Sequence, residues 1–139
     1  MERAARLDRK CAIFSEALRG FETSLAIDTT AFDPVVADAI RNGRIQKFEY
    51  CAELCWKLVK EFLLVRRGID TPAPKSVAKE SFQVGIVDER GYEAFVAMID
   101  DRNALSHLYL PAEFNRIHSA LEAHLATMKQ ICEYVCGAE

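Results

Sequence analysis

Glycine and proline are scarce in this 139-residue chain, which has 6 and 4 of them. A fold of many short strands needs frequent turns, and turns draw heavily on these two residues. The chain also lacks sustained alternation of apolar and polar residues, and no segment repeats at a fixed period. Its length is nevertheless sufficient to bury a core without metal or disulfides. We therefore expect residues 1–139 to form a single all-α domain.

A strong basic excess is absent as well, since 18 Lys and Arg residues face 21 Asp and Glu residues. Proteins that bind duplexes by neutralising phosphates usually carry such an excess, although a local patch for RNA is invisible in a total. The longest strongly apolar run, residues 62–65, is too short for a membrane span. The charged N-terminus does not resemble a signal peptide, so we expect a cytoplasmic protein without a membrane partner.

No Gly-rich phosphate loop, metal triad or nucleophile elbow is present, and we expect neither a cofactor nor a metal. Reduced cysteines typical of the cytosol would be buried as small apolar residues. Two pairs of cysteines have i,i+4 spacing, which leaves a four-thiolate zinc site as the alternative, although structural zinc sites usually use tighter turns. The five cysteines are Cys11, Cys51, Cys55, Cys132 and Cys136.

Hydrophobic periodicity predicts five helical segments. Asp33 and Gly68 have the residue types that begin and end the second segment, Ser76 can cap the third, and Pro111 can open the fifth. Short connections between long helices indicate an up-and-down bundle of four or five helices. The second segment is apolar over more than one stripe, which suggests the bundle centre or a subunit interface. The expected spans are 3–27, 34–67, 77–86, 89–107 and 111–136.

The apolar face of the fourth segment turns polar in its last two turns, at Arg102, Asn103 and Ser106. Arg offers a fork of donors for phosphate, and His107 can move protons near neutral pH. Together they suit attack of a ribose 2′-hydroxyl on the adjacent phosphodiester, with Asn103 orienting the imidazole. Arg102 and His107 lie about 140° apart around an ideal helix, so they converge only near a helix end or between two copies. The structural alternative is a helix end with Arg102 in a salt bridge and His107 exposed.

Three other features have plain structural interpretations. His124 lies in the apolar seam of the fifth segment and is expected to be a satisfied core residue. Trp56 is expected to be a core anchor rather than a stacking platform. Arg41, Arg44 and Lys47 form a small basic cluster that is typical of a solvated face.

Three segments in order, residues 45–57, 77–86 and 98–107, resemble the substrate-binding subunits of nucleotidyltransferases, which belong to the HEPN superfamily. The last segment contains the Arg and His of the superfamily signature, with four residues between them. Tyr109 extends this signature to a His-x-Tyr form. The resemblance covers residues 5–135 and implies a helical bundle that forms a homodimer or higher homo-oligomer.

The resemblance also implies a function in a two-component system with a minimal nucleotidyltransferase encoded nearby. Arg102 and His107 would be the catalytic pair of a metal-independent ribonuclease toxin, with Asn103 as support. The nucleotidyltransferase would neutralise the toxin by adding AMP to Tyr109. The alternatives are a non-catalytic subunit that binds RNA or nucleotide and presents substrate to the nucleotidyltransferase, and a purely structural helical dimer. The chain has no nucleotidyltransferase signature of its own.

Overall fold

A computed structural model of the chain describes residues 1–107 and 110–137. These residues form six α-helices and one short 3-10 helix, and no strand occurs among them. The expected all-α bundle is therefore confirmed. Its elements are α1 (Glu2–Leu25), η1 (Thr29–Ala31), α2 (Pro34–Arg67), α3 (Pro74–Gln83), α4 (Glu89–Ala104), α5 (Pro111–Ser119) and α6 (Leu121–Gly137).

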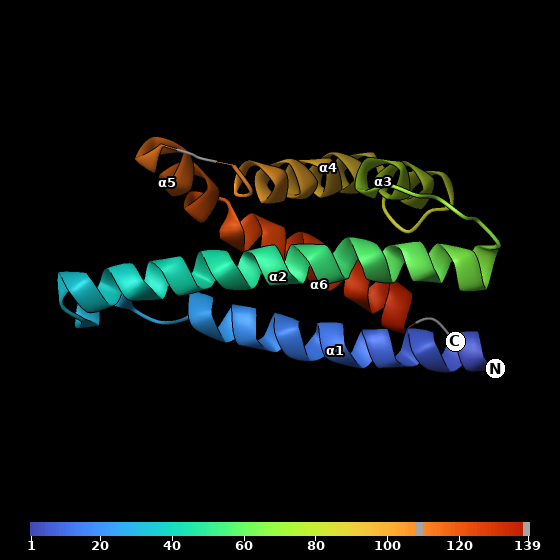
Figure 1. Cartoon of the computed structure of the whole chain (residues 1–139), viewed down its shortest axis with the longest axis horizontal. Helices are drawn as coiled ribbons and strands as arrows, with labels where there is room; N and C mark the ends of the chain where they lie inside the picture. Colours follow the sequence, from blue (N-terminus) through green and yellow to red (C-terminus); the bar gives the residue numbers. More distant parts are fainter. Residues whose placement is uncertain (108–109, 138–139) are drawn as a thin grey trace.

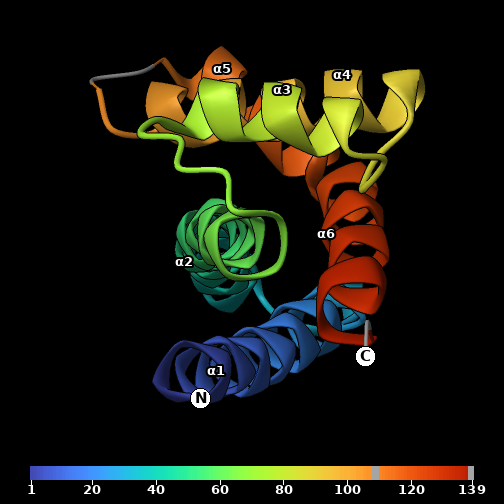
Figure 2. The same ribbon diagram turned by 90° about the vertical axis from the view of Figure 1, so that its right-hand side faces the viewer.

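Helix α2 is the centre of the bundle, because it contacts each of the other five α-helices. Helix α1 lies antiparallel along one side of it, α3 and α4 cover the opposite side, and α6 runs obliquely past it (Figures 1 and 2). The Asp33 side chain accepts a hydrogen bond from the Val36 amide at 2.9 Å, and Gly68 ends the helix with φ of 69°. Both ends of α2 are as predicted. The helix buries the side chains of Phe48, Cys55 and Phe62.

Several other helix boundaries differ from the prediction: α1 ends at Leu25 rather than at 27, and α3 spans Pro74–Gln83 rather than 77–86. Helix α3 begins at Pro74, so Ser76 lies inside its first turn. There the Ser76 hydroxyl accepts a hydrogen bond from the Ala73 amide at 3.1 Å. Helix α4 ends at Ala104 rather than at 107. The amide of His107 donates to the Ala104 carbonyl at 3.3 Å, which is a turn and not a continued helix. The signature histidine therefore follows the helix instead of lying on it.

The single helix predicted over 111–136 is wrong, since it breaks at Ala120 into α5 and α6. Ala120 has φ of −92° and ψ of −5°, and its amide donates to the Ile117 carbonyl three residues back. The predicted seam survives the break, because the seam residues Leu121, Met128 and Ile131 are fully buried. No proline or glycine marks this break, and its cause lies in the polar contacts described below.

The basic cluster on α2 does not form a purely solvated face. Arg44 is only 7% exposed, and its guanidinium donates to the carbonyls of Ser24 at 2.8 Å and Ile27 at 2.7 Å. These carbonyls lie at the end of α1, where a helix leaves acceptors without partners and favours a positive charge. Arg44 thus caps α1 from the neighbouring helix, whereas Lys47 is exposed as expected.

The expectation of five reduced cysteines is wrong for one pair. Cys11 of α1 and Cys136 of α6 form a disulfide with their Cα atoms 5.6 Å apart, a separation typical of such a bond. The four-thiolate zinc site is contradicted too, because it needs Cys136 as a ligand. Cys51 and Cys55 are buried free thiols, and burial raises the pKa of Cys51 to about 12. None of the described helices has an apolar stretch long enough to cross a membrane.

Candidate functional site

The last turns of α4 carry the predicted site residues. Phe95, Met98 and Ile99 of this helix are buried in the core. One turn further, the Arg102 guanidinium reaches toward α2, where its Nε lies 3.5 Å from Glu53 Oε2. Its Nη1 donates to Ser106 Oγ. At this turn, the face of α4 that is apolar earlier in the helix borders an opening between α4 and α2. Its residues are polar here for that reason.

This opening is a pocket of about 190 Å³ between α2, α4 and the start of α3. Trp56 lies in its wall, and its indole Nε1 donates to Glu53 Oε2 at 3.1 Å. Trp56 packs against the hydrophobic core as predicted, but it also faces this pocket. The lining residues are Ala52, Glu53, Trp56, Pro74, Ile99, Arg102 and Asn103. We call this the Trp56 pocket.

Two carboxylates of α2 set the charge around Arg102. Burial acts to raise the pKa of Glu53, whereas hydrogen bonds from Trp56 and Lys57 act to lower it. With the charges of Lys57 and Arg102 added, the pKa of Glu53 lies below its usual value. For Glu49, burial raises the pKa, and the charge of Arg102 opposes this increase. The pKa values of the two carboxylates beside Arg102 are thus shifted in opposite directions, downward for Glu53 and upward for Glu49.

Within one copy of the chain, Arg102 and Asn103 share the Trp56 pocket, but His107 does not line it. His107 is exposed, and its imidazole makes no hydrogen bond or ion pair with any residue that the structure describes. The predicted hydrogen bond between Asn103 and His107 is therefore not formed. The arrangement in a single copy corresponds to the structural alternative, an ion-paired Arg102 beside an exposed His107. Tyr109 lies outside the described residues.

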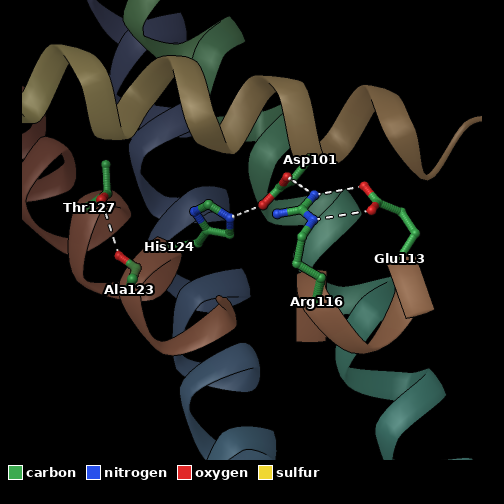
Figure 3. Close-up of polar contacts among 6 residues, drawn as sticks. All are labelled: Asp101, Glu113, Arg116, Ala123, His124 and Thr127. Carbon is green, nitrogen blue, oxygen red and sulfur yellow. Dashed lines mark hydrogen bonds and ion pairs between the residues drawn. The ribbon is translucent and has the colours of Figure 1, made fainter. Parts of the chain in front are cut away.

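A second polar cluster on the other side of α4 was missed by sequence reasoning. Asp101 is 6% exposed, and its two carboxylate oxygens have different partners (Figure 3). One oxygen is hydrogen-bonded to His124 Nε2 at 2.7 Å, and the other accepts a hydrogen bond from Arg116 Nη2 at 2.7 Å. Arg116 also donates to Glu113 at 2.8 Å. His124 is buried and stacks on Phe48 at 5.0 Å between ring centroids, which confirms it as a satisfied core residue. Asp101 is thus the acid that joins α4 to both α5 and α6.

This cluster accounts for the break at Ala120. Arg116 and His124 are eight residues apart, which is about 12 Å along a straight helix. With the chain bent at Ala120, both side chains reach the same carboxylate (Figure 3). One sequence signal could have revealed Asp101, because an acid in the last turn of a helix opposes the helix dipole and needs a compensating partner.

The comparisons with known proteins decide the family. Residues 10–135 match the family described as "Nucleotidyltransferase substrate binding protein like". The chain belongs to this family. The match spans all three segments on which the resemblance was based, including the turn with Arg102 and Asn103.

A solved structure supports the same assignment for this member of the nucleotidyltransferase substrate-binding-protein-like family. A crystal structure of a protein from Thermus thermophilus is 26% identical to it, with a TM-score of 0.73. The similarity covers 85% of this chain and 94% of the Thermus chain. The search among curated proteins finds no match. The shared fold thus extends over nearly the whole bundle.

Proposed function

We propose that this chain is the HEPN subunit of a two-component nucleotidyltransferase system and cuts RNA with Arg102 and His107. The observation that carries the proposal is the family match over the turn that holds Arg102, together with the pocket onto which Arg102 opens. The nucleotidyltransferase itself is the partner that the family description suggests. Tyr109 is proposed as the residue that this partner modifies with AMP.

The proposed chemistry is a transesterification within the RNA. His107 takes the proton of a ribose 2′-hydroxyl, whose oxygen forms a bond to the adjacent phosphorus. The bond from phosphorus to the 5′-oxygen breaks, and this oxygen takes up a proton. Arg102 stabilises the negative charge on the phosphoryl oxygens. The products are a 2′,3′-cyclic phosphate and a 5′-hydroxyl end.

The proposed active form is a homodimer in which the ends of two α4 helices face each other. Arg102 and His107 are not joined within one copy, and His107 is exposed beyond the end of α4. A second copy placed there would bring its own Arg102 and His107 to the same RNA. The exposed imidazoles would then serve as the base and the acid of one reaction.

Cleavage of RNA by the purified protein in the presence of EDTA tests this proposal. We expect the wild type to produce 2′,3′-cyclic phosphate ends and His107→Ala and Arg102→Ala to produce none. Arg66→Ala, which removes an exposed guanidinium at the end of α2, is the control and should cut like the wild type. Cleavage that persists in both signature variants would rule out the proposed catalytic pair.

The second candidate is a recognition subunit that does not cut. One observation favours it: Arg102 is already ion-paired with Glu53, and no hydrogen bond or ion pair among the described residues orients the His107 imidazole. Under this candidate neither the wild type nor His107→Ala cuts RNA. Both would still form a stable complex with the nucleotidyltransferase encoded nearby, as measured by co-purification and light scattering. If no complex forms, this candidate fails.

A further inference from the structure

We propose that the Trp56 pocket binds one unpaired nucleobase and prefers guanine. This inference rests on the proposed function, because it names the part of an RNA that the same site takes. It concerns how the base is held and distinguished, and not the cutting step. Three properties of the pocket carry it: its size, its aromatic wall and the order of its polar groups.

The size of the pocket matches a single base. Its volume of about 190 Å³ is below the roughly 300–1,000 Å³ of pockets that enclose drug-sized ligands. A whole nucleotide therefore does not fit inside, whereas one flat ring system does. Ala52, Pro74 and Ile99 supply an apolar lining around that ring.

Trp56 provides a stacking surface whose orientation is fixed. Its indole N–H is held by Glu53, and no other aromatic ring among the described residues stacks on it. Proteins that bind single-stranded RNA commonly stack unpaired bases on such side chains. A ring that is already oriented loses little conformational freedom when a base packs against it.

The polar groups of the pocket form an ordered pattern of donor and acceptor. The Nε–H of Arg102 is buried and makes no hydrogen bond, although it lies within ion-pair distance of Glu53. Next to this free donor stands the ionised Glu53 carboxylate, which only accepts. Its Oε1 is engaged by Lys57 at 3.1 Å, a half-exposed pair that a ligand can replace at little cost.

Guanine presents the complementary edge. Its O6 accepts a hydrogen bond, and the adjacent N1–H and N2–H groups donate two. Arg102 Nε–H would donate to O6, and the Glu53 carboxylate would accept from both N–H groups. Uracil offers a single N–H between two carbonyl oxygens, so one of these oxygens would face the carboxylate. Adenine and cytosine each offer one amino group next to a ring acceptor.

Trp56 is the single tryptophan of the chain, so its fluorescence reports on this pocket alone. Titrating the full chain with GMP should quench this emission in a saturable way, and UMP of equal charge should bind at least about tenfold more weakly. Glu53→Gln, which keeps the tryptophan, should remove the preference for GMP. Lys57→Gln, which removes the competing surface pair, should retain it. Circular dichroism verifies that both variants fold.

A second readout uses a variant without the reporter. Trp56→Leu, followed by calorimetry, should bind GMP at least about fivefold more weakly, because base stacking is lost. Absence of saturable quenching by GMP, equal affinity for GMP and UMP, or a preference that survives in Glu53→Gln would each overturn the inference. GMP contains no scissile linkage, so these results do not depend on cleavage. If the protein cuts RNA but does not bind GMP, the inference about the pocket fails and the proposed function stands. If it binds GMP but does not cut RNA, the proposed cleavage fails and the inference about the pocket stands.

Discussion

Arg44 lies in an environment that its sequence context does not predict. It belongs to a basic cluster on α2, yet it is 7% exposed and donates to two carbonyls of the α1 end. A buried charge is tolerated only when its hydrogen-bonding groups are satisfied. The interaction therefore fixes where α1 ends relative to the first half of α2.

Replacing Arg44 with Ala should destabilise the protein by about 2–3 kcal/mol, because the carbonyls of Ser24 and Ile27 lose the hydrogen bonds from its guanidinium. Lys47→Ala is the matched control, since it removes an exposed positive charge one turn away on the same helix. We expect the control to change the free energy of unfolding by no more than about 0.5 kcal/mol. Urea denaturation followed by circular dichroism measures both. Equal effects would show that Arg44 acts only through its charge.

Helix α4 is held from two sides at its last turn. Asp101 contacts α5 and α6, while the next residue, Arg102, contacts α2. Adjacent helical residues point about 100° apart, so these two side chains reach different neighbours. The turn that carries the proposed site is consequently fixed by long-range contacts on both sides.

Asp101→Ala should lower the free energy of unfolding by about 2–4 kcal/mol, because His124 and Arg116 lose their common partner. Glu113→Ala removes the exposed partner of the same arginine and should lower it by less than about 1 kcal/mol. Thermal and urea unfolding distinguish the two. A small effect of Asp101→Ala on the free energy of unfolding would mean that the contacts of Asp101 with His124 and Arg116 do not stabilise the fold.

The glycine within α2 and the glycine at its end should respond in opposite directions to substitution by Ala. Gly43 lies within the helix with open space around it, so Gly43→Ala should stabilise by about 0.5–1 kcal/mol. Gly68 has φ of 69°, a conformation that costs a residue with a Cβ, so Gly68→Ala should destabilise by about 1 kcal/mol. Urea midpoints of the two variants provide the measurement. Changes of the same sign would contradict the assigned roles.

At the scale of the whole molecule, the disulfide between Cys11 and Cys136 joins the two ends of the chain. The two residues are 125 positions apart in the sequence. A cross-link over so long a loop restricts the unfolded chain strongly. It also holds the C-terminal end of α6 against α1 (Figure 2).

Cys136→Ser should reduce the free energy of unfolding by about 2–5 kcal/mol under oxidising conditions. Addition of a reducing agent should remove most of the difference between this variant and the wild type. Cys132→Ser, which alters a free cysteine one turn earlier, is the control and should keep its sensitivity to reduction. A wild-type stability that does not respond to reduction would contradict a stabilising disulfide.

The sequence by itself determined the features that depend on neighbours along the chain. The ends of α2 were predictable because Asp33 caps its own first turn and Gly68 adopts the left-handed conformation that ends a helix. The apolar seams were predictable because burial follows the helical period. The family and the turn with Arg102 and Asn103 were predictable because their motifs are continuous segments.

Tertiary structure alone decided the features that join distant residues. The bend at Ala120, the capping of α1 by Arg44 and the disulfide of Cys11 all depend on contacts between helices. The pairing of Arg102 with Glu53 is of the same kind. A local pattern gives the face on which a side chain lies, but not the side chain that it meets there. Only the packing of α4 against α2 places an arginine, a carboxylate and a tryptophan around one pocket.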